Sequence, residues 1–199
     1  MSLWIKCFVR GVSVKIFNSR IISSNEVFNI KYFSVEDDKG NKVPDYLIIE
    51  PKIINQDNIS GACIMPILDT KIGLLNNFRP ALNQFCLEIP HGFHEEDETI
   101  EETSLRELEE ETGLIGNKEN LIDLGVMAPD SGIINGRVKI FLVKVEKRGA
   151  DVVNEFGLGK LSFYSPLEVS NLIKENKLID SFTLVAFYRA IVEGYIILK

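Results

Sequence analysis

Apolar and polar residues alternate along the first quarter of the chain, which is the pattern of β-strands with one buried face. The run VFNIKYFSVEDDKGNKVPDYLIIE contains two such segments, separated by Asp38-Lys39-Gly40-Asn41. Turn-forming residues between two alternating segments are typical of a β-hairpin. We therefore predict a small N-terminal antiparallel β domain over residues 1–57.

Strands and helices follow in irregular order from residue 58 onward. The run GACIMPILDTKIGLLNNF predicts two strands joined at Asp69-Thr70-Lys71, and LIDLGVMA and RVKIFLVKVE predict two more. Ser165-Pro166 is a cap followed by a first-turn proline, and SFTLVAFYRAIVEG has helical periodicity. Because no βαβ unit repeats, the pattern favours an α+β sandwich over residues 58–199.

A further helix is predicted inside a strongly acidic segment. Thr99 has Glu102 three residues after it, which is the spacing of a capping box. Gly113 provides the left-handed residue that commonly ends a helix. The helix is therefore expected to run from about residue 100 to residue 112.

Charge and composition narrow the possible partners. The chain has 199 residues and a net charge of −7, and eleven of its 29 acidic residues lie between Glu88 and Glu111. No basic patch of the kind that holds a phosphate backbone is evident, so nucleic acid is not an expected partner. The three cysteines are far apart, and no apolar run of about 18 residues is present. We expect a cytoplasmic protein with no membrane partner.

Carboxylates crowd one face of the acidic helix. Glu107, Glu110 and Glu111 stand at positions i, i+3 and i+4, where side chains share a face and like charges repel. Either this face is fully solvated or a cation binds there. Mg²⁺ and Mn²⁺ prefer such oxygen ligands, and the adjacent Arg106 can orient a carboxylate or reach a phosphate.

The spacing of the glycine, arginine and glutamate residues in this segment favours a cation site over a solvated face. Gly92, five residues, Glu98, seven residues and then Arg106-Glu107-Leu108-x-Glu110-Glu111-x-Gly113-Leu114 resembles the signature of the Nudix hydrolases. The resemblance implies a Nudix-type α/β/α sandwich with a mixed sheet. It also implies Mg²⁺-dependent hydrolysis, with Mn²⁺ as a possible substitute, in which a metal-activated water attacks phosphorus in a P–O–P bridge.

The same resemblance assigns roles to individual residues. It implies metal ligands at Glu107, Glu110 and Glu111, a further main-chain ligand from the carbonyl of His91, and a loop-ordering or water-mediated role for Glu98. His91 stands where the family commonly has a small residue. The candidate general base is Glu155, in the loop after the long strand, and catalytic roles are also expected for Glu110 and Arg106.

Further residues are similar to the ADP-ribose and nucleotide-sugar pyrophosphatases of the family. In LLNNFRPALNQFCLEIPHGF, Arg79 ends a strand and Glu88 leads into the signature glycine, so both are expected to serve substrate binding. Similar enzymes are homodimers in which the N-terminal β domain reaches the partner's site, and Tyr46 is a candidate to stack there on the base. The predicted substrate is ADP-ribose or a related nucleoside diphosphate sugar.

Two alternatives remain. One is a housecleaning hydrolase of nucleoside triphosphates or dinucleoside polyphosphates, which would release different products. The other is a Nudix fold that binds ligands without cleaving them. The presence of every signature glutamate favours an enzyme.

Overall fold

The computed structural model describes residues 13–145 and 156–198. The chain divides into two compact units, which we describe separately. The first contains residues up to 54 together with residues 130–136, and the second contains residues 55–129 and 137–199.

The first unit is built on a three-stranded antiparallel sheet. Its strands β1 (Val14–Ser24), β2 (Phe28–Asp37) and β3 (Lys42–Pro51) are arranged in that order. The β2–β3 turn is closed by the Asp37 carboxylate, which accepts hydrogen bonds from the main-chain nitrogens of Lys39 and Asn41. Gly40 has a φ of 83°, a conformation that glycine adopts without strain. The predicted hairpin is confirmed.

Residues 130–136 join this unit although they lie far away in the sequence. Ile49 in β3 exchanges main-chain hydrogen bonds with the segment, donating to Ile133 and accepting from Asn135, both at 2.9 Å. The Tyr46 hydroxyl donates to the Gly132 carbonyl at 2.7 Å. The segment thereby satisfies main-chain groups of β3 that an edge strand would leave unpaired. The alternation of residues did not predict this addition.

The second unit contains a seven-stranded mixed sheet. Its central path is β10-β5-β4-β9-β8, with β6 paired to β5 and β7 paired to β4. The pair β4–β9 is parallel, and the other pairs are antiparallel. The strands are β4 (Ile59–Leu68), β5 (Lys71–Arg79), β6 (Gln84–Glu88), β7 (His91–Phe93), β8 (Leu121–Met127), β9 (Arg137–Val145) and β10 (Leu161–Tyr164).

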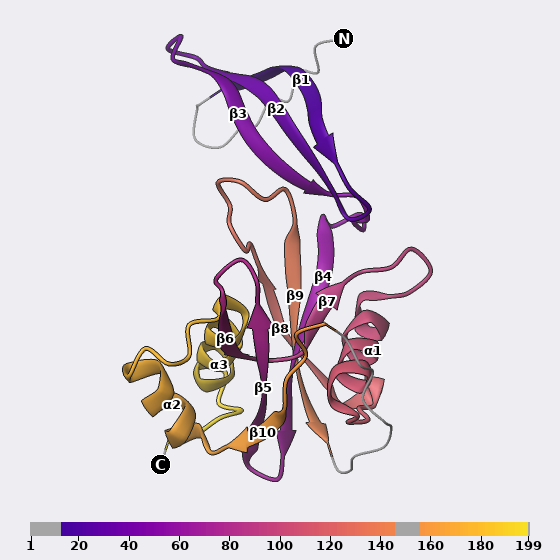
Figure 1. Ribbon diagram of the computed structural model, residues 1–199, viewed down its shortest axis with the longest axis vertical. Helices are drawn as coiled ribbons and strands as arrows, with labels where there is room; N and C mark the ends of the chain where they lie inside the picture. The colour runs from indigo at the N-terminus through magenta and orange to yellow at the C-terminus, as the bar shows by residue number, and fades with distance from the viewer. Residues whose placement is uncertain (1–12, 146–155, 199) are drawn as a thin grey trace. The chain divides into compact units, whose positions relative to one another are not determined.

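Helices cover both faces of this sheet. Helix α1 (Ile100–Thr112) lies on one face, and α2 (Pro166–Lys174) and α3 (Ser181–Val192) lie on the other (Figure 1). Strand β4 serves both cores because its side chains alternate between the faces. Ile64 packs in the cluster that contains Leu108 of α1, and Met65 packs in the cluster that contains Phe187 of α3. The predicted α/β/α sandwich with a mixed sheet is therefore confirmed, as is the preceding small β sheet.

The ends of α1 follow the predicted signals. The Thr99 hydroxyl accepts a hydrogen bond from the main-chain nitrogen of Glu102, and the Glu102 carboxylate accepts one from the Thr99 nitrogen in return. Gly113 ends the helix in the left-handed conformation, with a φ of 67°. None of the helices in the described parts of the chain is long and apolar enough to cross a membrane.

Candidate active site

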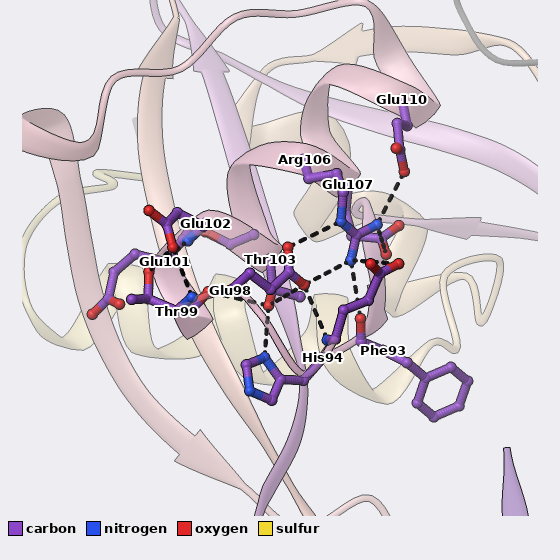
Figure 2. A network of polar contacts seen from close by, with 12 residues as sticks. Phe93, His94, Glu98, Thr99, Glu101, Glu102, Thr103, Arg106, Glu107 and Glu110 are labelled. Carbon is purple, nitrogen blue, oxygen red and sulfur yellow. Dashed lines mark hydrogen bonds and ion pairs between the residues drawn. The ribbon is translucent and has the colours of Figure 1, made fainter. Parts of the chain in front are cut away.

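Arg106 of α1 is the hub of the acidic segment. Its guanidinium donates to Glu98 from Nε at 3.1 Å and from Nη2 at 2.9 Å. Nη1 donates to Glu107 at 2.8 Å and to Glu110 at 3.0 Å, while Nη2 also reaches the Phe93 carbonyl (Figure 2). One side chain thereby fixes three carboxylates and ties α1 to the loop before it.

These contacts keep the arginine and its loop partner charged. Burial alone would raise the pKa of Glu98, but hydrogen bonds from Arg106, Thr103 and the Glu95 nitrogen outweigh burial and lower that pKa. The pKa of Arg106 is raised in turn, chiefly by its hydrogen bonds to Glu98. Glu98 thereby connects Arg106 and Thr103 of α1 to the main chain of the preceding loop.

Gly92 lets α1 approach strand β7 closely. A Cβ at position 92 would clash with the carboxylate of Glu107. The side chain of Glu107 is 12% exposed, so it lies in a tight space between Arg106 and the glycine backbone. A larger residue at position 92 would therefore displace the Glu107 carboxylate from its place, although no unusual φ is involved.

Glu111 lies deeper than the other acidic residues of α1. It is 7% exposed, and its Oε2 accepts a hydrogen bond from the main-chain nitrogen of His91 at 3.1 Å. Burial, with added repulsion from Glu107, raises the pKa of Glu111 to about 8. No lysine or arginine of the described residues forms an ion pair with it. A buried carboxylate with this pKa is characteristic of a functional site.

The expected convergence of Glu107, Glu110 and Glu111 is not seen. Among residues 13–145 and 156–198, no three His, Cys, Asp or Glu side chains are gathered closely enough to hold a metal ion by themselves. Arg106 pairs with Glu107 and Glu110, whereas Glu111 lies apart against His91. The guanidinium of Arg106 offsets the repulsion between Glu107 and Glu110, whereas Glu111 is held by a main-chain donor instead.

The donor set nevertheless fits a hard divalent cation. Glu107 and Glu111 stand one helical turn apart on the same face of α1, and oxygen donors suit Mg²⁺. A bound cation would remove the cost of keeping Glu111 ionised.

Arg79 lies at the end of β5, as predicted, and is held by Glu88. Arg79 Nε donates to Glu88 Oε2 at 3.1 Å, and Nη2 lies 2.7 Å from Oε1. The side chain of Glu88 is only 3% exposed, whereas that of Arg79 is 38% exposed. The buried Glu88 carboxylate therefore fixes the orientation of the Arg79 guanidinium. Arg79 is the more exposed member of the pair and is accessible to a ligand.

The two histidines at the start of the signature, His91 and His94, have different surroundings. His94 is buried, its main-chain nitrogen donates to the Ser60 carbonyl, and its Nδ1 lies 3.0 Å from the Thr103 hydroxyl. His91 contacts Arg79 through its ring as well as Glu111 through its main chain. The resemblance assigns a role to the His91 carbonyl, and the sequence does not indicate that the ring contacts Arg79. The ring contact depends on a long-range approach of β5 that residue spacing does not encode.

Two further predicted residues are not placed relative to this cluster. Tyr46 belongs to the first unit, where its ring stacks on Phe33 at 5.7 Å between centroids and its hydroxyl is bonded to Gly132. Glu155 lies outside the described residues. The other predicted residues lie on α1, on the loop before it and on the segment from β5 to β7, and they are Arg79, Glu88, His91, Glu98, Arg106, Glu107, Glu110 and Glu111.

The fold and these side chains define a Nudix hydrolase. The NUDIX domain model matches residues 57–179, which is more than half of the chain, so the protein belongs to this family. An uncharacterized Nudix hydrolase of Schizosaccharomyces pombe is 29% identical over 154 residues, covering 74% of each chain.

Other similar proteins, which match over a shorter stretch or at lower identity, are described by a particular activity. An ADP-sugar pyrophosphatase of Mus musculus is 54% identical over 43 residues, which are 22% of this chain and 20% of that protein. A methanol dehydrogenase activator of Bacillus methanolicus is 26% identical over 177 residues, or 86% of this chain and 92% of that one. The crystal structure of an ADP compounds hydrolase has a TM-score of 0.75 at 16% identity, covering 92% of this chain and 97% of that chain, which shows a shared fold.

Proposed function

We propose that this Nudix hydrolase cleaves the diphosphate bridge of ADP-ribose or a related nucleoside diphosphate sugar, with Mg²⁺ as cofactor. The products are a nucleoside monophosphate and a sugar phosphate. The observation that carries the proposal is that a buried carboxylate, Glu111, and a more exposed arginine, Arg79, both contact one residue, His91. The local similarity to an ADP-sugar pyrophosphatase supports the choice of substrate.

The proposed metal residues are Glu107, Glu110 and Glu111, with the His91 carbonyl and Glu98 as further oxygen donors. When bound, Mg²⁺ neutralises diphosphate charge and lowers the pKa of water. Arg106 orients Glu107 and Glu110 from one side, and the His91 nitrogen orients Glu111 from the other. Arg79, held by Glu88, is positioned to bind a phosphate oxygen of the substrate.

Product analysis tests this proposal. The protein is incubated with Mg²⁺ and, separately, with ADP-ribose, GDP-mannose, a nucleoside triphosphate and a dinucleoside polyphosphate. We expect a nucleoside monophosphate from one or both nucleotide sugars and slower release of product from the others. Preferential cleavage of the triphosphate or the dinucleoside polyphosphate would instead identify a housecleaning hydrolase. Binding without cleavage of any substrate would identify a ligand sensor.

Glu155 is our candidate general base. Its replacement by glutamine keeps the side-chain size and removes the basic oxygen, so we expect kcat to fall about 100-fold at neutral pH. Since a positioned base acts on the chemical step, KM should change much less. Asp151, four residues earlier in the sequence, is the second candidate for this role, and Asp151→Asn tests it in the same way. Unchanged turnover of the Glu155→Gln protein would remove Glu155 from the mechanism.

We also propose a homodimer in which the N-terminal β unit of one protomer contributes to the substrate site of the other, with Tyr46 contacting the base. Light scattering coupled to size exclusion should then give twice the 22.5 kDa mass of one chain. A Tyr46→Phe substitution removes only the hydroxyl that bonds Gly132 and keeps the ring, so it should preserve substrate affinity better than Tyr46→Ala. A fully active monomer would contradict the proposal.

A further inference from the structure

We propose that the imidazole of His91 is a positioning residue that holds Arg79 for the substrate diphosphate. The inference rests on the proposed function, because it concerns the arginine that would bind phosphate. His91 is the first residue of β7, where its ring faces Arg79 and its main chain faces Glu111.

The hydrogen bonds of the ring define its proton arrangement. His91 Nδ1 lies 2.8 Å from the Ile89 carbonyl, which can only accept, so Nδ1 carries the proton. Nε2 lies 2.8 Å from Nη2 of Arg79, which can only donate, so Nε2 presents its lone pair. The ring is therefore a neutral acceptor for the guanidinium, and a side chain without an acceptor at this position would lose the contact.

Residues at the beginning of α3 pack against the His91 ring and fix the main chain that orients it. Phe182 packs edge-on against it, with centroids 4.9 Å apart and planes at 61°. The Ile89 main-chain nitrogen donates to the Thr183 hydroxyl at 2.9 Å, and that hydroxyl donates to Asp180, the N-cap of the helix. The first turn of α3 thereby fixes the carbonyl that orients the imidazole.

Two contacts then restrict the Arg79 guanidinium. Glu88 binds Nε and Nη2, and His91 shares Nη2. Nη1 is the guanidinium nitrogen with no hydrogen bond to another described residue, which leaves it available for a ligand oxygen. Since the nitrogen of His91 also bonds Glu111, one residue sets the spacing between the phosphate-binding arginine and the buried carboxylate.

Two substitutions of His91 distinguish the effect of its hydrogen-bond acceptor from the effect of its planar ring. His91→Phe keeps a planar ring against Phe182 but removes Nε2, whereas His91→Gln supplies a carbonyl oxygen that can accept from Arg79. We expect His91→Phe to raise KM for the nucleoside diphosphate sugar about tenfold and to change kcat less, because a binding contact is lost. The His91→Gln variant should recover most of the affinity.

A double-mutant cycle shows whether the effect passes through Arg79. In an Arg79→Ala background, His91→Phe should raise KM no further. The same four proteins are compared by calorimetric binding of methylene-bridged ADP-ribose, which is not hydrolysed, and circular dichroism verifies folding. If His91→Phe does not fold, His91→Ala replaces it in the cycle.

The outcomes distinguish the two proposals. Equal losses in His91→Phe and His91→Gln, or effects of His91 and Arg79 that simply multiply, would overturn the positioning role while the wild-type protein still cleaves its substrate. Failure of the wild-type protein to bind or cleave any nucleoside diphosphate would overturn the proposed function and this inference with it. Recovery by glutamine together with a non-additive cycle supports the positioning role.

Discussion

Replacing Glu111 with glutamine is expected to lower kcat about a thousandfold while the protein stays folded. The estimate follows from the several kcal/mol that a catalytic cation contributes to transition-state stabilisation. Glutamine has the same size and can still accept the hydrogen bond from the His91 nitrogen, so the local packing is retained. The matched control is Glu109→Gln, which changes an exposed residue of the same helix and should leave kcat within about twofold.

The same substitution should change how stability depends on pH. Burial and Glu107 raise the pKa of Glu111 from 4.5 to about 8. Between these pH values the folded, metal-free protein binds more protons at this site than the unfolded chain does. Its free energy of unfolding therefore falls as pH rises from about 4.5 to about 8, by at most about 1.4 kcal/mol for each unit of pKa shift. Glu111→Gln should remove this slope.

Metal removal provides the complementary measurement. Mg²⁺ requires the ionised carboxylate, so its apparent affinity should rise with pH up to about 8, and the stabilisation that it provides should rise in parallel. Thermal unfolding with Mg²⁺ and with EDTA, at several pH values, tests both statements. If Glu111→Gln kept the same Mg²⁺-dependent shift in Tm as the wild-type protein, Glu111 would not be a metal ligand.

Features governed by neighbouring residues could be predicted from the sequence. The capping box of Thr99 with Glu102 and the left-handed end at Gly113 depend on residues within one helical turn, and both are present. The hairpin turn at Gly40 is local in the same sense. The signature spacing likewise placed Arg106 beside the carboxylates, because residues four apart on a helix share a face.

Features that depend on distant segments could not be predicted in this way. Residues 130–136 pair with β3 through main-chain groups that every residue type possesses, so no side-chain pattern indicates the contact. The ring of His91 meets Arg79 because the end of β5 and the start of β7 lie close together, and Phe182 of α3 packs against the ring. The local sequence around His91 shows only a loop histidine.

Arg106→Gln is expected to lower both activity and stability. Its guanidinium binds Glu98, Glu107 and Glu110 at once, and its side chain is 26% exposed. Loss of an outer contact that orients a metal-binding carboxylate typically costs about 10- to 100-fold, so losing the contacts to Glu107 and Glu110 together should cost about 300-fold in kcat. Leaving the less exposed Glu98 and Glu107 without a cation should lower the free energy of unfolding by about 2–3 kcal/mol.

The Arg106→Lys variant separates charge from geometry. Lysine restores a positive charge, but its ammonium cannot form the planar, multidentate contacts of a guanidinium. We therefore expect Arg106→Lys to recover most of the stability, measured by urea unfolding, and little of the lost kcat. Recovery of both would mean that charge alone is required at position 106. Recovery of neither would mean that the fixed orientation of Glu98 matters for folding as much as for catalysis, since Glu98 receives two of the guanidinium's hydrogen bonds and ties the loop to α1.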